Sequence, residues 1–515
     1  MIRTELIAPV SVLLKRHSAQ IPAKLAYKDA RTSVNYAELE RSTANLAGHL
    51  QDAGIETGDS VAIFLPNSVQ WVESCFAVVR AAAISVPISY DSTVPEISYR
   101  LEDAQCKAII TTDERFEMLQ GLLTANPEIK TLILVSRCES RVAGLCFDVL
   151  RDQMPKSLPR DILSIDETSF IIYTSGTTGR AKGVLLTQRS MFWVVAACWA
   201  PVAQLSDQDY VLSPLPLFHS YALNLSVLGI LATGASEYIL EKFSTTDVMK
   251  LLQAEPFTVL PGVPTMFHYL LEAARNEPEC EFPHLRVCLS AGAIMPAPIN
   301  QEFEQRFGVK LLDGYGITET STMVTMNWID GGRTMGSCGL PVPGLSVRLI
   351  HPATGLDVAT GEEGELIVRG PNVMQGYHRK PQETAQALKN GWYYTGDLAK
   401  SDPSGFLTIT GRLKELVIRG GQNIAPAEVE EAVCAHETVL DCAVVGAAHE
   451  HLGEVPVVFV VPRPGMTVVP EILIEHCRQR LSAYKVPAAI HLVDEIPRTG
   501  SGKIIRFKLK ETLKV

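Results

Sequence analysis

The loop "YTSGTTGRAKG", residues 173–183, decides how this sequence is interpreted, because it joins two apolar runs through three glycines, four Ser or Thr hydroxyls and two cations. Glycine lets several backbone N–H groups approach one anion, and the hydroxyls and Lys182 add donors and positive charge. The apolar run at 170–173 has the pattern of a β-strand. The stretch therefore predicts a phosphate-binding loop that follows a strand, and a flexible surface turn is the alternative.

This loop is not a Walker A element, which requires G-x-x-x-x-G-K-[ST]. Counted from Gly176, the second glycine position holds Ala181, and Lys182 is followed by Gly183 instead of Ser or Thr. The sequence therefore predicts nucleotide chemistry different from that of P-loop NTPases.

The N-terminal part of the chain alternates strand and helix patterns. Short apolar runs at 61–65, 108–110 and 132–135 predict buried strands, and apolar residues at helical spacing over 39–53 predict a helix. Asn67 is expected to cap the next helix. This alternation predicts an α/β fold, with mainly parallel sheets covered by helices.

Two changes of pattern divide the rest of the chain. From about Gly339, short β-rich runs are separated by Gly and Pro, which predicts a small β-barrel or an antiparallel layer. After Arg412, helix and strand patterns such as "PAEVEEAVCAH" and "VPVVFVV" predict a smaller α+β unit. We expect a large N-terminal domain of two helix-covered sheets over 1–411, a hinge at 412–414 and a mobile C-terminal domain over 415–515.

Composition excludes several classes of function. The net charge of -11 argues against nucleic acid or an anionic membrane as a partner. The eleven cysteines form no CxxC pair, and their odd number suggests reduced thiols and a cytoplasmic location. The apolar stretch at 221–235 is shorter than the ~20 residues that cross a bilayer, so we expect a buried helix there.

Five motifs in a fixed order point to one family. They are "YTSGTTGRAKGVLLTQ", "DGYGITET" (313–320), "YYTGDLAK" (393–400), "GRLKELVIRGGQNIAPAEVE" (411–430) and "PRTGSGKIIR" (497–506). Together they resemble the adenylate-forming superfamily of acyl-CoA synthetases, nonribosomal peptide adenylation domains and beetle luciferases, and most of all a bacterial acyl-CoA synthetase. The resemblance implies that a carboxylate attacks the α-phosphate of ATP to give acyl-AMP and pyrophosphate, after which a thiol displaces AMP.

The resemblance also implies the residues of the ATP site. The glycine-rich loop would wrap the β- and γ-phosphates, Tyr315 would stack on adenine, and Thr318 would bind the α-phosphate. Glu319 would be the Mg²⁺ ligand, and Asp397 with Arg412 would bind the ribose. The implied ATP and AMP contacts are Thr174, Ser175, Gly176, Thr177, Thr178, Gly179, Lys182, Ala291, Gly292, Asp313, Gly314, Tyr315, Gly316, Thr318, Asp397, Arg412 and Lys503.

Two half-reactions at one site imply a moving domain. In the family, the lysine that matches Lys503 enters the site only for adenylation, so the implied catalytic residues are Lys503, Thr318, Glu319 and His219. Lys414 matches the hinge position. His219, Gly420 and Gly421 match the passage of coenzyme A.

The acid is less well defined by the sequence. The implied acyl pocket consists of His219, Tyr221, Val263, Gly292, Gly316 and Met323. No carboxylate follows Phe218 through Leu223, so an α-ammonium group would be buried unpaired, which disfavours amino acids. An aliphatic or aromatic acid with coenzyme A as the acceptor is expected. The alternatives are a stand-alone ligase that loads an acyl carrier protein, a luciferase-like oxidation and a degenerate nucleotide-binding protein.

Overall fold

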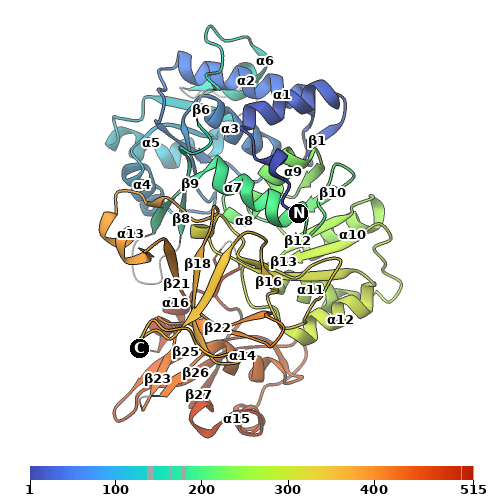
Figure 1. Cartoon of the computed structure of the whole chain (residues 1–515), viewed down its shortest axis with the longest axis vertical. Helices are drawn as coiled ribbons and strands as arrows, with labels where there is room; N and C mark the ends of the chain where they lie inside the picture. Colours follow the sequence, from blue (N-terminus) through green and yellow to red (C-terminus); the bar gives the residue numbers. More distant parts are fainter. Residues whose placement is uncertain are drawn as a thin grey trace.

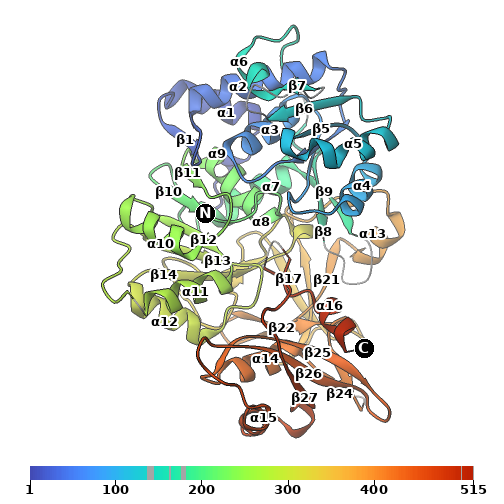
Figure 2. The same cartoon turned by 180° about the vertical axis from the view of Figure 1, so that it is seen from behind.

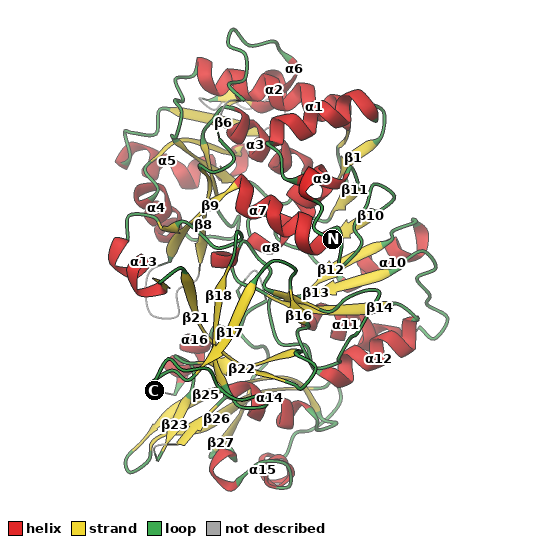
Figure 3. Ribbon diagram, in the orientation of Figure 1, coloured by secondary structure: helices red, strands yellow, loops and turns green. Residues whose placement is uncertain are grey.

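The computed structural model describes residues 1–135, 144–161, 164–174, 181–275, 277–420, 422–499 and 502–513. Within these residues the strands form four sheets. Two large sheets occupy the N-terminal part, and Figures 1 and 2 show a smaller C-terminal sheet with its helices (orange to red) below them. Figure 3 shows helices flanking both large sheets, as the alternating pattern predicts.

The first sheet has the order β19-β9-β8-β4-β3-β5-β6-β7 and is parallel from β8 to β7. Antiparallel pairing adds β9 to β8, and β19 to β9. The strands are β3 (Ser60–Phe64), β4 (Ile84–Pro87), β5 (Cys106–Thr112), β6 (Thr131–Val135), β7 (Leu145–Cys146), β8 (Thr168–Thr174), β9 (Lys182–Thr187) and β19 (Gly376–Tyr377). Their helices are α2 (Tyr36–Asp52), α3 (Val69–Arg80), α4 (Val94–Asp103), α5 (Phe116–Ala125) and α6 (Phe147–Asp152).

The second sheet has the order β16-β15-β14-β13-β12-β10-β11-β1-β2 and is parallel from β14 to β1. Its strands are β1 (Leu25–Lys28), β2 (Ser33–Asn35), β10 (Tyr210–Ser213), β11 (Ser236–Ile239), β12 (Val259–Gly262), β13 (Val287–Ser290), β14 (Lys310–Tyr315), β15 (Thr325–Met326) and β16 (Leu340–Pro341). The helices are α1 (Val10–Gln20), α7 (Gln188–Val194), α8 (Ser220–Ala222), α9 (Ile230–Thr233), α10 (Thr245–Ala254), α11 (Pro264–Ala274) and α12 (Ala297–Phe307), with π-helical turns at η3 (Val195–Trp199) and η4 (Leu223–Gly229).

Two smaller sheets follow in the chain. The third sheet is antiparallel, so the expected β-rich segment is an antiparallel layer, formed by β17 (Ser346–Ile350), β18 (Gly364–Arg369), β20 (Leu388–Lys389), β21 (Trp392–Ser401) and β22 (Leu407–Arg412), with α13 (Pro381–Ala387) beside it. The C-terminal unit contains β23 (Val417–Arg419), β24 (Gln422–Ile424), β25 (Val439–His449), β26 (Gly453–Pro462), β27 (Ala489–Leu492), α14 (Pro426–Cys434), α15 (Pro470–Arg478) and α16 (Arg506–Thr512). The α/β fold and its separate C-terminal domain confirm the predicted class.

The helix expected at 221–235 is present and buried, but it is continuous from Ser220 to Thr233 through a π-helical turn. Among the described residues, no helix combines the length and the hydropathy needed to cross a membrane.

The predicted cap at Asn67 is wrong, because Ser68 caps α3 by accepting a hydrogen bond from the N–H of Trp71. The Asn67 amide instead donates to the carbonyls of Leu215 and Leu240, while its oxygen accepts from the N–H of Leu217. Asn67 therefore anchors the loop that leads from β10 to His219, a long-range role that local sequence does not reveal.

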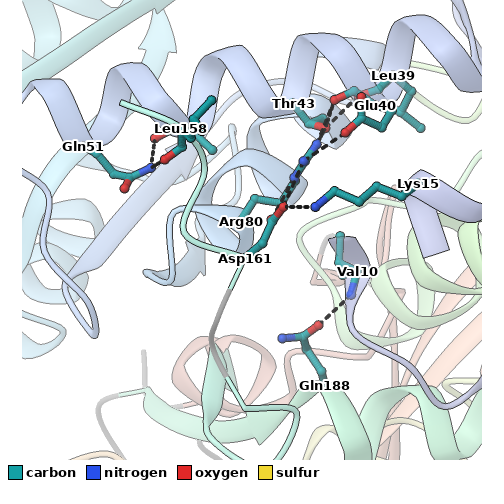
Figure 4. A network of polar contacts seen from close by, with 11 residues as sticks. Val10, Lys15, Leu39, Glu40, Thr43, Gln51, Arg80, Leu158, Asp161 and Gln188 are labelled. Atoms are coloured by element: carbon teal, nitrogen blue, oxygen red, sulfur yellow. Dashed lines mark hydrogen bonds and ion pairs between the residues drawn. The ribbon is translucent and has the colours of Figure 1, made fainter. Parts of the chain in front are cut away.

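A buried ion-pair network ties α1, α2 and α3 together (Figure 4). The side chain of Arg80 is 1% exposed and pairs with Glu40 and Asp161 at 3.0 Å, and it also donates to Thr43. Lys15 reaches the same carboxylate of Asp161 at 2.8 Å. A buried guanidinium is tolerated only with such complete pairing, so these contacts fix α1, α2 and α3 relative to one another.

Candidate active site

The parallel strands of the second sheet bring several predicted residues to one edge. β10, β12, β13 and β14 are neighbours, and their carboxyl ends meet on the same side. Open α/β sheets bind ligands at this edge. The predicted residues that follow these strand ends are His219 and Tyr221 after β10, Val263 after β12, Ala291 and Gly292 after β13, and Gly316, Thr318, Glu319 and Met323 after β14, where Asp313, Gly314 and Tyr315 are the last strand residues.

The base of the predicted phosphate loop is an antiparallel hairpin in the first sheet. Thr174 ends β8 opposite Lys182, the first residue of β9, and the Thr174 hydroxyl donates to the Lys182 carbonyl at 3.5 Å. The predicted contacts Ser175, Gly176, Thr177, Thr178 and Gly179 lie outside the described residues.

Tyr377 links this hairpin to the turn after β14. The Lys182 ammonium lies 4.8 Å from the centre of the Tyr377 ring, and the Tyr377 hydroxyl donates to Glu319 Oε1 at 3.0 Å. Because β19 pairs with β9, Tyr377 lies directly opposite Val184. Tyr377 thus connects a cation of the first sheet with a carboxylate that follows a strand of the second.

Asp397 and Arg412 are register partners on β21 and β22. Arg412 Nε donates to Asp397 Oδ1, and the hydroxyl of Tyr315 donates to Asp397 Oδ2. The carboxylate is buried, with a side-chain exposure of 2%, and its charge raises the pKa of Arg412. Each carboxylate oxygen has two lone pairs, so Asp397 retains acceptor capacity for a ribose diol.

The turn after β14 is held by contacts on both sides. Thr318 is buried, and its hydroxyl lies 3.2 Å from the hydroxyl of Ser220 at the start of α8. The carbonyl of Glu319 accepts a hydrogen bond from the N–H of Met374. Two buried polar contacts therefore orient the residues predicted to face the α-phosphate.

The walls of the predicted acyl pocket are mainly apolar. Met323, Val263 and Tyr221 are buried. The Tyr221 hydroxyl donates to the carbonyl of Leu289 at 2.9 Å, and its ring stacks on Trp199 with 5.9 Å between the ring centres. The Tyr221 hydroxyl therefore donates its hydrogen bond within the protein, and the Tyr221 ring is a flat apolar surface.

Lys503 lies in this site although it belongs to the C-terminal unit. Burial is the main cause that lowers the pKa of Lys503, followed by the charge of Arg412, while Asp397, Glu319 and Glu415 act in the opposite direction. Gly502, the preceding residue, has positive φ, and a Cβ at this position would lie 3.2 Å from Val263 Cγ2. The lysine loop therefore packs against the end of β12.

His219 faces the same lysine. Burial, and then the charge of Lys503, lower the pKa of His219 to about 3, so its imidazole is neutral at neutral pH. Its Nδ1 accepts a hydrogen bond from the N–H of Tyr221 at 3.3 Å. A neutral imidazole adds no positive charge that would repel Lys503.

The predicted hinge and coenzyme A residues lie at the start of the C-terminal unit. Lys414 is exposed in a turn in which the N–H of Glu415 donates to the carbonyl of Arg412 at 3.0 Å. Gly420 is exposed with φ of +56°, and Gly421 lies outside the described residues. Neither Lys414 nor Gly420 follows a strand end of the second sheet.

Glu319 is compatible with the predicted Mg²⁺ site. Mg²⁺ usually binds one or two carboxylates together with substrate phosphates and water, so a dedicated cluster is not required. Among the described residues no group of three or more His, Cys, Asp and Glu side chains could hold a metal ion. A single carboxylate near Lys182 fits a metal bound mainly by phosphates.

Sequence reasoning missed Tyr377 and Ser220. Tyr377 lies in "MQGYH", outside the five motifs, and only the pairing of β19 with β9 brings it to the site. Ser220 directly follows His219, so its place beside the predicted acyl pocket was a signal that could have been used.

Comparison with known proteins defines the family. A model described as "AMP-binding enzyme" matches residues 14–378, and one described as "AMP-binding enzyme C-terminal domain" matches residues 428–503. The chain belongs to the AMP-binding enzyme family. This assignment confirms the resemblance to adenylate-forming enzymes that the five motifs indicated.

Relatives of this AMP-binding enzyme align along nearly its whole length. It is 34% identical over 496 residues to a feruloyl-CoA synthase of Amycolatopsis, covering 96% of this chain and 97% of that protein. It is 35% identical over 558 residues to a long-chain-fatty-acid–CoA ligase of Yersinia pestis, covering 97% and 98%. The crystal structure of ATP-bound MatB from Rhodopseudomonas palustris superposes with a TM-score of 0.90 at 29% identity, covering 98% of this chain and 99% of that one.

Proposed function

We infer that this protein is an AMP-forming acyl-CoA synthetase, which activates a carboxylic acid as acyl-AMP with release of pyrophosphate and transfers the acyl group to coenzyme A. The observation that carries the mechanism is the position of Lys503. Gly502, the residue before it, packs against Val263 of the N-terminal part, and the charges of Arg412, Asp397 and Glu319 act on the Lys503 ammonium. A lysine from the C-terminal unit thus reaches the N-terminal site, as adenylation requires.

The first half-reaction joins two anions, so the site must supply positive charge and alignment. We propose that Lys182 and the glycine-rich loop bind the β- and γ-phosphates, while Thr318 and Lys503 bind the α-phosphate that the carboxylate attacks. Glu319 would hold Mg²⁺, which supplies charge neutralisation at the phosphates. The position of Tyr377 supports these assignments, because its ring contacts Lys182 and its hydroxyl binds Glu319.

The nucleoside would be fixed by a second set of residues. Asp397 would accept hydrogen bonds from the ribose hydroxyls, with Arg412 orienting the carboxylate through its hydrogen bond to Oδ1. Tyr315 would stack on adenine, and its hydroxyl bond to Asp397 sets the position of its ring. The backbone at Ala291 and Gly292, beside the strand ends, would flank both the adenine and the acyl group.

The second half-reaction requires Lys503 to leave so that a thiol can reach the acyl carbon. The coenzyme A thiol would lose its proton to water, and its sulfur would attack the acyl-AMP carbonyl carbon. The bond between that carbon and the phosphate oxygen would break, and AMP would depart with the bonding pair. We propose that the C-terminal domain, residues 415–515, rotates about 412–414 and brings Gly420 and Gly421 beside the pantetheine arm near His219.

Replacement of Gly420 by Ala tests this passage. A side chain at φ of +56° is strained and narrows the proposed thiol path, so we expect Gly420→Ala to slow thioester formation from pre-formed acyl-AMP about tenfold while changing adenylation less than about twofold. Gly405→Ala is a matched control, because Gly405 also has positive φ and its nearest neighbour is also a leucine methyl at 3.7 Å. Equal effects of the two variants would contradict the proposed path.

The acid is proposed to be an apolar aliphatic or aromatic carboxylic acid. The buried Val263 and Met323 with the flat ring of Tyr221 favour such a group. The relatives named feruloyl-CoA synthase and long-chain-fatty-acid–CoA ligase are consistent with both chemical classes. A cytoplasmic location, argued from the cysteines, is part of the same proposal.

A panel of acids tests the assignment. Ferulate, benzoate, decanoate and palmitate are each incubated with ATP and Mg²⁺, with and without coenzyme A, and pyrophosphate and thioester are measured; phenylalanine is the α-amino-acid control. We expect pyrophosphate with at least one apolar acid and faster turnover with coenzyme A. Thioester on a phosphopantetheinylated acyl carrier protein but not on coenzyme A would favour the alternative acceptor. No pyrophosphate with any acid would contradict the function.

A further inference from the structure

The C-terminal unit touches the N-terminal part at a second place, away from the reacting atoms. Arg463, in the turn after β26, forms an ion pair with Glu272 on α11, with 2.6 Å between Nη1 and Oε1. The side chains are 19% and 26% exposed, so the pair is partly withdrawn from water and less screened than a surface pair. Neither residue lies in any of the five motifs or belongs to the predicted site.

The ion pair lies close in the fold to the lysine loop. The N–H of Arg463 donates to the carbonyl of Thr438, next to the start of β25. Asp441, two residues into that strand, binds Arg498 through both carboxylate oxygens at 2.8 and 2.9 Å. Arg498 Nη1 then donates to the carbonyl of Gly502 at 2.9 Å. The same sheet end that Arg463 attaches to α11 therefore also holds the residue before Lys503.

Helix α11 connects both contacts on the N-terminal side. It begins at Pro264, directly after Val263, against which Gly502 packs, and Glu272 lies on the same helix about two turns further on. The charges of Asp441 and Arg498 also reach Tyr269 on this helix, where burial and then Asp441 raise the tyrosine pKa. One rigid helix thus contacts the C-terminal unit at both ends.

We propose that Glu272 and Arg463 are positioning residues for Lys503. The ion pair between Glu272 and Arg463 would stabilise the domain arrangement that performs adenylation. This inference rests on the proposed rotation of the C-terminal domain. When that domain turns, Arg463 leaves α11 and the pair is broken. The pair consequently favours the first half-reaction over the second, without touching either substrate.

The test separates the two half-reactions. Decanoate and ferulate are the probe acids, and whichever gives faster pyrophosphate release is used throughout. Single-turnover pyrophosphate release without coenzyme A measures adenylation, and thioester formation from synthetic acyl-AMP measures the second step. We expect Glu272→Gln and Arg463→Gln each to slow adenylation about five- to tenfold and to leave the second step unchanged or faster.

Charge exchange and a control variant sharpen the test. Glu272 also pairs with Arg275, three residues along the same helix, at 3.2 Å, so the exchange is made in an Arg275→Gln background that removes this second cation. In that background, Glu272→Arg with Arg463→Glu should recover at least half of the adenylation rate that either single change loses. The control is Glu302→Gln on α12, because Glu302 pairs with Arg275 of α11 at 3.1 Å and does not involve the C-terminal unit; this variant should change neither step. The thermal midpoints of all variants are compared with that of the wild type, because a general loss of folding would lower both steps together.

The failures are distinguishable. Equal loss of both steps in the single variants, unchanged adenylation, or no recovery on charge exchange would overturn the positioning role while leaving the enzyme's function intact. A wild-type enzyme that releases no pyrophosphate with either acid would instead contradict the activity on which the inference rests, and would overturn both.

Discussion

Lys503→Ala is expected to slow adenylation at least about 100-fold while leaving thioester formation from pre-formed acyl-AMP within about threefold of wild type. Lys503 is the cation that the C-terminal unit brings to Asp397, Glu319 and His219. Its charge would be needed only while the carboxylate and the α-phosphate are being joined. Single-turnover assays of pyrophosphate release and of thioester formation measure the two steps separately.

Lys508→Ala is the matched control, because Lys508 is an exposed lysine of the same C-terminal unit. It should change neither half-reaction. If Lys503→Ala slowed both steps equally, Lys503 would be required throughout the cycle and the two-arrangement mechanism would be wrong.

Gly316→Ala is expected to lower adenylation about 100-fold, an effect typical of a misplacement of about 1 Å in an active site. A Cβ on Gly316 would lie 1.3 Å from the carbonyl oxygen of Thr322, so the turn that carries Thr318 and Glu319 must move. Pyrophosphate release and the thermal midpoint are measured together, since the same clash also destabilises the fold.

The control is Gly121→Ala on α5, where no atom lies within 4 Å of the added methyl group. Alanine is the better helix former, so this variant should be at least as stable as the wild type and fully active. Normal adenylation in Gly316→Ala would show that the turn after β14 does not position the reacting phosphate.

Much of the fold could be predicted from the spacing of apolar residues and from the positions of glycine and proline. The strands predicted at 61–65 and 108–110 correspond to β3 and β5, and the helix predicted over 39–53 corresponds to α2. Each of these elements buries apolar residues that its own sequence pattern displays. The helix cap predicted at Asn67 was wrong because the contacts of this residue are not local. Its hydrogen bonds go to carbonyls about 150 or more residues away, and local capping patterns contain no information about such partners.

In the candidate site, too, some contacts could be predicted from the sequence and others could not. Asp397 and Arg412 lie in separate motifs, and their ion pair follows from the antiparallel register of β21 and β22. The contacts of Tyr377, by contrast, depend on a short strand added to the edge of a sheet formed some 190 residues earlier. The pair of Glu272 and Arg463 depends on how two units dock, which no pattern within either unit determines.

The central claim is that the acid is activated as acyl-AMP, and isotope transfer tests it most directly. The acid that gives the fastest turnover is labelled with ¹⁸O in both carboxylate oxygens and converted with ATP and coenzyme A, and the products are analysed by mass spectrometry. Attack of the carboxylate on the α-phosphate, followed by cleavage of the acyl–oxygen bond, leaves one ¹⁸O in each AMP, one in the thioester and none in pyrophosphate. Unlabelled AMP, or label in pyrophosphate or orthophosphate, would contradict the account.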